Sequence, residues 1–245
     1  MKNRGFSIPE LLIVSFIFSI FMVVSYLILS QGMAVWSKTE SSQNVSFQLQ
    51  KARAALRRDL LQASRVELET TGDLLWFLTS ISPQGGQAQH DDGRPFWQRN
   101  TLYYLAKPLN HQEIFQTDCG TDPGLCPHKI LIRKILDTGV PTTPDGLATT
   151  EEQVMTSQAA RSFATTPSGL YPLPEEGVES VDVIATGLLS LSFAVNPKGV
   201  SPGEVEVTLK GFDLTKGHEK VRLGLDDLTE STRTEELRFS VFLPD

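Results

Sequence analysis

The sequence predicts an α+β fold in which one long N-terminal helix packs against an antiparallel β-sheet. Residues 11–30 form an uncharged apolar run, and at about 1.5 Å per residue such a helix matches the roughly 30 Å hydrocarbon core of a bilayer. Further along the chain, several short segments alternate apolar and polar residues, as half-buried strands do. No helical pattern separates these segments, so a parallel βαβ sheet is not expected.

The apolar run is expected to cross a membrane once. Lys2 and Arg4 precede it, and the next charge after it is Lys38. The positive-inside rule therefore places the N-terminus in the cytoplasm and the rest of the chain outside. A cleaved secretory signal has a shorter apolar region of about 7–15 residues that ends in small residues. These features predict a single-pass inner-membrane protein with a periplasmic C-terminal domain.

Glu10 lies one residue before the apolar run. An ionised carboxylate inside the bilayer costs on the order of 2–4 kcal/mol, so at that depth it requires a partner or stays neutral. A simpler interpretation places Glu10 at the headgroup level, after Pro9 in the first turn of a helix whose dipole favours a negative charge. That interpretation leaves the preceding pair, Gly5 and Phe6, without an explanation.

The order Gly5-Phe6-Ser7, Glu10 and the apolar run resembles the class III signal of type IV prepilins and type II secretion pseudopilins. The resemblance implies that a prepilin peptidase cuts after Gly5 and that the new N-terminal residue, Phe6, is N-methylated. It also implies that Glu10 neutralises the N-terminal amine of a neighbouring subunit, which would favour assembly because each charge is costly alone in lipid. A plain N-terminal membrane anchor is the alternative.

Helical character continues beyond the apolar run, because no proline occurs between Pro9 and Pro83. Apolar residues recur at steps of three and four and define one face. They are Val45, Leu49, Ala52, Leu56, Leu60 and Ala63. A basic stripe lies on the other face and consists of Lys51, Arg53, Arg57, Arg58 and Arg65. We expect one helix over about residues 9–66, with Gly32 as a candidate bend and the basic stripe either solvated or in contact with acidic subunits or phospholipid headgroups.

Residues 56–63 read Leu-Arg-Arg-Asp-Leu-Leu-Gln-Ala, which resembles a stretch in minor pilins of the W type and minor pseudopilins of the J type. The Gly-Tyr pair that often follows it in the W type is missing, which favours the J type. The resemblance implies a type IV pilin-like fold. Its expected parts are a leader at residues 1–5, a transmembrane half-helix at 6–30, an amphipathic half-helix at 31–68 and a periplasmic head at 69–245.

Within the head, six segments have strand patterns. They are residues 74–79, 101–106, 129–136, 188–195, 204–214 and 236–243. Residues 82–94 and 137–178 are rich in Gly, Pro, Thr and Ser and are expected to form long loops, the second with a short helix within 151–163. Trp76, Phe96 and Trp97 are interpreted as core or rim aromatics, and a binding role for Trp97 stays open.

Cys119 and Cys126 are the only cysteines, and six residues separate them. In an oxidising compartment we expect them to form a disulfide. The alternative is a zinc site made of both cysteines with His128 and His111, since thiolate and imidazole suit that ion. Asp118 and Asp122 of the same loop are a further candidate for binding calcium, although aspartate is also common in turns and on soluble surfaces. The cysteine spacing is not that of a usual zinc knuckle, and the loop is expected to lie outside the cytosol. We therefore expect a disulfide and no metal.

Catalytic motifs are not found. The sequence has no Gly-x-Ser-x-Gly elbow, no phosphate-binding glycine loop and no carboxylate pair beside a nucleophile. A non-enzymatic protein without a cofactor is predicted, and the formal net charge of −7 opposes nucleic-acid binding.

The prepilin resemblance implies a minor pilin or pseudopilin that helps to initiate or cap a type II secretion pseudopilus or a type IV pilus. Its implied partners are other minor and major pilins or pseudopilins, the prepilin peptidase and an inner-membrane assembly platform, and the J type adds secreted cargo. Two alternatives stay open. One is a minor pilin that binds a surface or takes up DNA, and the other is an anchored periplasmic protein that never polymerises.

Overall fold

The computed structural model describes residues 8–80, 86–90, 92–116, 126–137, 151–173, 175–195, 203–212 and 234–243. The chain divides into two units, Met1–Gln43 and Asn44–Asp245. Each unit is described separately below.

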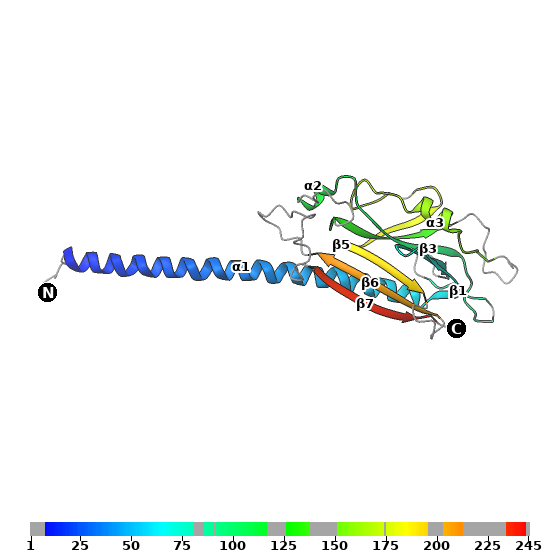
Figure 1. The fold of residues 1–245 in the computed structure, drawn as a ribbon, viewed down its shortest axis with the longest axis horizontal. Coiled ribbons are helices and arrows are strands. Elements are labelled where there is room, and N and C mark those ends of the chain that lie inside the picture. The colour runs from blue at the N-terminus through cyan, green and yellow to red at the C-terminus, as the bar shows by residue number, and fades with distance from the viewer. Residues whose placement is uncertain are drawn as a thin grey trace. The chain divides into compact units, whose positions relative to one another are not determined.

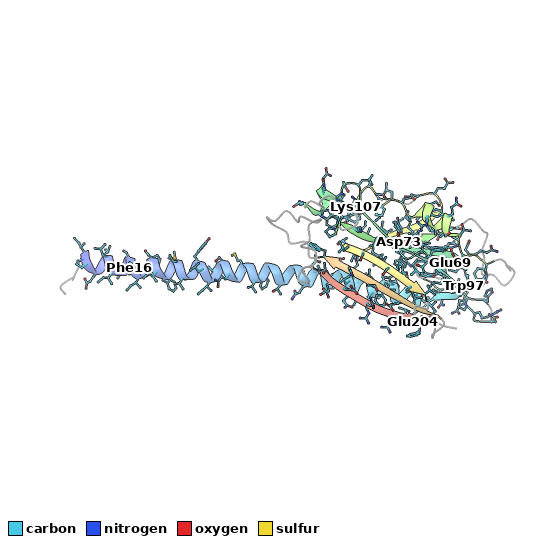
Figure 2. The ribbon with its side chains drawn as sticks, in the orientation of Figure 1. Phe16, Glu69, Asp73, Trp97, Lys107 and Glu204 are labelled. Atoms are coloured by element: carbon cyan, nitrogen blue, oxygen red, sulfur yellow. The ribbon has the colours of Figure 1, made fainter. Side chains whose placement is uncertain are left out.

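The first unit contains most of the helix α1, which runs from Ile8 to Leu60 and continues through Gly32 without interruption. The segment Ile8–Met33 has a mean hydropathy of 2.7 and is long and apolar enough to cross a membrane. Its polar side chains are satisfied within the helix, since the Ser15 and Ser19 hydroxyls each donate to the carbonyl four residues earlier. Figure 2 shows Phe16 projecting from this segment. Length and composition therefore agree with the predicted span.

The second unit is built on one antiparallel sheet of seven strands, whose spatial order follows the order along the chain (Figure 1). The strands are β1 (Ala63–Thr70), β2 (Leu74–Thr79), β3 (Arg99–Ala106), β4 (Lys129–Leu136), β5 (Val178–Val195), β6 (Glu204–Phe212) and β7 (Thr234–Phe242). Two short helices accompany them, α2 (His111–Phe115) and α3 (Ser157–Phe163). The predicted pilin-like α+β fold is confirmed.

The end of α1 corrects the sequence prediction, which extended the helix to Val66 and the amphipathic half to residue 68. The helix ends at Leu60, and the Gln62 amide donates to the Asp59 carbonyl in a tight final turn. From Ala63 the chain pairs instead with β2, where Leu68 lies opposite Phe77. Sheet pairing therefore supplies the backbone hydrogen bonds that a longer helix would have made.

Other elements also differ from the sequence prediction, in their bounds or in their number. The sequence pattern predicted six strands and missed β1, and it started β5 at residue 188 although that strand begins at Val178. Helix α3 lies within the range predicted for a short helix, and its N-cap, Thr156, accepts a hydrogen bond from the Ala159 amide. Helix α2 was not predicted. Its five residues carry too short a pattern to be recognised.

The apolar face of α1 packs on one face of the sheet. All six residues predicted for that face are buried, and Leu49, Ala52, Leu56 and Leu60 are at most 1% exposed. They join one core with side chains from the strands, among them Phe77, Tyr103 and Leu131 near the middle of the sheet. The C-terminal part of α1 is therefore a structural element of the head.

A second core lies on the other face of the sheet, under residues 151–173. Trp76, Tyr104 and Ile132 are buried there against Met155 and Ala160. The Trp76 indole donates to the Met155 carbonyl at 2.8 Å, which fastens the covering segment to the sheet. Because both faces are covered, seven of the eight residues of β4 are buried, and its sequence combines five apolar residues with Lys129, Arg133 and Lys134.

α1 packs tightly against the sheet at Gly211 of β6. A Cβ atom added there would lie 2.7 Å from Val45 Cγ1 and 3.4 Å from Leu49 Cγ. We expect Gly211→Ala to lower the free energy of unfolding by about 1–3 kcal/mol through overpacking. Urea denaturation of the detergent-solubilised chain, followed by tryptophan fluorescence, measures the change.

Gly32→Ala is the matched control for this substitution, because an added Cβ there meets nothing within 4 Å and alanine favours a helix. Equal unfolding midpoints for the Gly211→Ala variant and the wild type would show that α1 packs on β6 less closely than described.

Candidate assembly site and the buried contacts of the helix

The residues predicted for processing and assembly lie at the start of the chain. Glu10 is in the first turn of α1, and its side chain is exposed. Gly5 and Phe6 lie outside the described residues, so cleavage and methylation stay predictions. Glu10 is therefore the one member of the predicted N-terminal site that the structure places.

The helix surface that follows Glu10 is apolar on all sides. Leu11, Phe16 and Phe21 are 61%, 68% and 66% exposed within the protein. Large exposed apolar side chains continue beyond the membrane-length segment, with Val35 at 66% and Trp36 at 74%. Exposed apolar surface on this scale is typical of a site that lipid or other proteins cover.

The other end of α1 is fixed in the head by a polar cluster, which we call the Asp59 cluster: the buried Asp59, Tyr103 and Arg133, and Asp182, whose side chain is 51% exposed. Asp59 is 1% exposed. Its Oδ2 atom accepts hydrogen bonds from the Tyr103 hydroxyl at 2.7 Å and from Arg133 Nε at 2.5 Å. Arg133 Nη1 lies 3.2 Å from Asp182 Oδ2, so the guanidinium bridges two carboxylates. The buried carboxylate is thus both neutralised and hydrogen-bonded, as a buried charge must be.

The sheet register explains why these side chains meet. Tyr103 on β3 pairs directly with Arg133 on β4, and Arg133 pairs with Asp182 on β5. Directly opposed residues project from the same face of a sheet, and in this row that is the face under α1. Burial, followed in importance by the Asp59 charge, raises the pKa of Tyr103 well above its usual value. The phenol therefore stays a hydrogen-bond donor to Asp59.

The Asp59 cluster was not predicted from the sequence, although Asp59 lies within residues 56–63, which carry a family resemblance. The available signal was position, since Asp59 follows Leu56 by three residues and Ala52 by seven and so lies on the apolar helix face. Arg133 gave a second signal, because it and Lys134 are charged residues between the apolar residues of one strand. A carboxylate on one apolar face and a guanidinium in a buried strand together indicate a buried ion pair.

Lys134 connects β4 to a second segment of the chain, on the opposite face of the sheet. Its Nζ atom donates to the Phe163 carbonyl at 2.8 Å and to Thr165 Oγ1 at 2.9 Å, and it lies 3.2 Å from Glu175 Oε2. Burial lowers the pKa of Lys134, and the hydrogen bond from the Thr165 hydroxyl lowers the pKa of Glu175. Lys134 therefore holds the segment that covers the second core.

The basic stripe of α1 is not uniformly solvated. The Arg53 guanidinium lies 5.7 Å from the centroid of the Phe239 ring, and Arg58 Nε donates to Asp59 Oδ1 at 2.8 Å. Lys51 and Arg57 are exposed. The stripe thus contributes both to packing within the head and to its charged surface, while the side chain of Arg65 lies outside the described residues.

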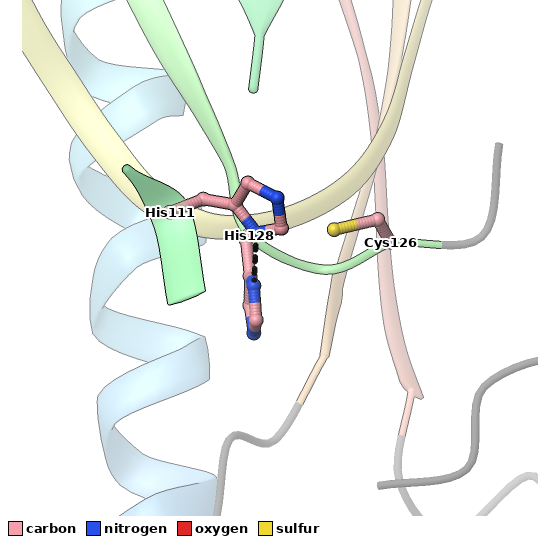
Figure 3. A group of neighbouring side chains, drawn as sticks. All are labelled: His111, Cys126 and His128. Carbon is pink, nitrogen blue, oxygen red and sulfur yellow. Dashed lines mark hydrogen bonds between the residues drawn. The ribbon is translucent and has the colours of Figure 1, made fainter. Parts of the chain in front are cut away.

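The structure describes three of the four residues of the predicted cysteine and histidine cluster. Cys126 is fully buried, whereas Cys119 lies outside the described residues, so the Cys119–Cys126 disulfide stays a prediction. His128 is also fully buried, although the sequence placed it in a polar loop, because it directly precedes β4. His111 begins α2, and its Nδ1 atom lies 2.9 Å from Nδ1 of His128 (Figure 3).

The aromatic residues of the sequence analysis lie where they were expected. Trp76 and Phe96 are buried in the core. Trp97 is half-buried (Figure 2), and its carbonyl accepts a hydrogen bond from the Glu152 amide. This contact connects Trp97 to the segment that covers the second core, and a binding role for Trp97 is not tested by it.

Residues 1–26 match the prokaryotic N-terminal methylation motif, the motif of the class III prepilin signal. The N-terminal signal and the α+β fold of the chain are therefore both pilin-like. Comparisons with curated proteins and with solved structures gave no match.

Proposed function

We propose that the protein is a minor pilin or pseudopilin subunit, which is cut after Gly5, methylated at Phe6 and assembled through α1 into a type II secretion pseudopilus or a type IV pilus. The observation that carries the proposal is the match of residues 1–26 to the methylation motif, on a helix whose first half exposes apolar side chains on all sides. Such a surface suits both storage in a bilayer and packing among other helices of the same kind.

Glu10 has the central role in this assembly. Cleavage after Gly5 creates a new amine at Phe6, four residues before Glu10 in the sequence. In a fibre, the carboxylate of one subunit and the amine of its neighbour would form an ion pair in an apolar environment. Because each charge is costly alone in lipid, pairing favours the assembled state over the separate subunits.

The Asp59 cluster and the apolar face of α1 attach the C-terminal part of the helix to the head. A fibre subunit is held in place by its helix, so the C-terminal part of α1 has to stay attached to the head. Four leucine or alanine side chains of α1 that are nearly inaccessible to solvent, together with the buried Asp59 carboxylate, provide that attachment. The head is then free to present its remaining surface to partners.

The assignment as a minor subunit, and the J type in particular, rests on the resemblance of residues 56–63. We propose that the partners are other minor and major pilins or pseudopilins and the inner-membrane assembly platform. The exposed Lys51 and Arg57 lie on the face of α1 that the sheet does not cover and are candidates for contact with acidic subunits. Cargo binding by the head would follow from membership of a tip complex.

Processing is tested by Gly5→Ala. We expect this variant to keep its leader in cells that contain an active prepilin peptidase, because the class III signal that the chain resembles implies a cut after Gly5. The retained residues 1–5 are detected by mass spectrometry of the purified protein. Gly32→Ala is the matched control and should be processed like the wild type. Equal processing of Gly5→Ala and wild type would contradict the proposed cleavage site.

A further inference from the structure

We propose that His111 and His128 form a binding site for a first-row transition-metal ion of the Zn²⁺ class. The two imidazoles come from different elements, because His111 begins α2 and His128 directly precedes β4. Figure 3 shows the rings directed at each other, with Nδ1 facing Nδ1. This inference is independent of the proposed fibre function.

The geometry of the two nitrogen atoms suits a shared metal ion. They lie 2.9 Å apart, and with metal–nitrogen bonds of about 2.0–2.1 Å they would subtend an angle of roughly 90° at the metal. Opening the pair by a few tenths of an ångström would reach the tetrahedral angle that zinc prefers. On metal binding the proton shared by the two Nδ1 atoms would leave that position, and the ring that donated it would carry a proton on Nε2 instead, so that both rings bind as neutral imidazoles.

The rings are held in this arrangement by their surroundings. His128 is fully buried, and its ring stacks on Phe115 with centroids 4.8 Å apart and planes 15° from parallel. The His111 ring lies 5.1 Å from the His128 ring and is only partly buried, which leaves a route for an ion from solvent. The fixed His128 and the accessible His111 are therefore in position before the ion binds. This lowers the conformational entropy that is lost on binding.

Cys126 lies close to the pair, since its Sγ atom and the nitrogen atoms of both histidines are all within 4.8 Å of one another. The sequence assigns this sulfur to a disulfide with Cys119, and no free cysteine is found in the described part of the chain. The proposed site therefore uses the two imidazoles as its protein ligands, with water in the remaining positions.

The donor set selects the class of ion. Imidazole nitrogen suits Zn²⁺, Cu²⁺ and Ni²⁺, whereas Mg²⁺ and Ca²⁺ prefer oxygen ligands. A bound ion would join α2 to the start of β4 and so fix the two ends of residues 112–127.

The test is isothermal titration of Zn²⁺ into the full-length, detergent-solubilised protein, prepared without a polyhistidine tag. Wild type is compared with His111→Ala, with His128→Ala and with His90→Ala. The last is the matched control, because His90 makes its contact with Glu151, 2.8 Å away, outside this site. Circular dichroism checks that each variant folds, and the partly exposed His111 keeps the test decisive if His128→Ala unfolds the head.

We expect wild type and His90→Ala to bind one Zn²⁺ per chain, and His111→Ala to bind it at least about 100-fold more weakly. That loss exceeds the roughly 10–100-fold effect of removing a group that only supports a ligand. The proposal is overturned if wild type binds no Zn²⁺, if His111→Ala binds it as tightly as wild type, or if Mg²⁺ binds as tightly as Zn²⁺.

Discussion

Replacing Glu10 with valine is expected to abolish incorporation into the fibre while leaving membrane insertion intact. Insertion depends on the apolar segment Ile8–Met33, which keeps its length and becomes more apolar in the variant. Assembly depends on the ion pair between Glu10 of one subunit and the N-terminal amine of the next. Without the carboxylate, that amine would enter the apolar fibre interior as an isolated charge, at a cost of several kcal/mol.

The measurement is the share of the protein that fractionates with sheared fibres in cells that supply the other subunits, compared with the share in the membrane. Glu113→Val is the matched control, because it makes the same chemical change at an exposed position of α2. We expect the control to assemble normally. Normal assembly of Glu10→Val would show that the charge pair is not needed, and it would favour an anchored protein that does not polymerise.

The second large effect is expected in the Asp59 cluster. Asp59→Ala removes the acceptor of both the Tyr103 hydroxyl and Arg133 Nε, in an environment where Asp59 is 1% exposed and Arg133 is 7% exposed. Removing one partner of a buried ion pair typically lowers the free energy of unfolding by about 3–5 kcal/mol. We expect a loss of that order in urea denaturation of the detergent-solubilised protein, followed by tryptophan fluorescence.

Two further variants separate the buried pair from a general effect of losing a carboxylate. Asp92→Ala removes an ion pair with Arg94 on an exposed loop and should leave the unfolding midpoint almost unchanged. Asp59→Leu combined with Arg133→Met replaces the pair by apolar side chains and should recover most of the loss, since such replacements are often neutral. A loss below about 1 kcal/mol for Asp59→Ala would mean that the cluster behaves like a surface pair.

The fold was largely predictable from local patterns. The four- and three-residue spacing of Val45, Leu49 and Ala52 correctly identified the buried helix face, and alternation in β6 correctly identified a half-buried strand. These patterns succeed because burial on one side of an element repeats with the period of its backbone. The same logic fails at β1, where a strand follows α1 after a two-residue turn and its extent is decided by pairing with β2.

The polar contacts were less predictable because they join residues far apart in the sequence. Asp59 and Arg133 are separated by 74 positions, and their contact depends on the register between β3, β4 and β5. His111 and His128 meet only because α2 follows β3 closely and returns the chain toward the start of β4. A sequence can flag such residues as unusual for their surroundings, but the pairing requires the fold.

The proposed function is tested most directly by the intact mass of the membrane-purified wild-type protein under non-reducing conditions, measured beside the Gly5→Ala variant. We expect the wild-type mass to match a chain that begins at a methylated Phe6, and the variant to retain Met1 to the altered residue 5. A mass that also lacks two hydrogens would fit the predicted disulfide of Cys119 and Cys126. A wild-type chain that still begins at Met1, in cells with an active prepilin peptidase, would contradict the assignment as a processed pilin-like subunit.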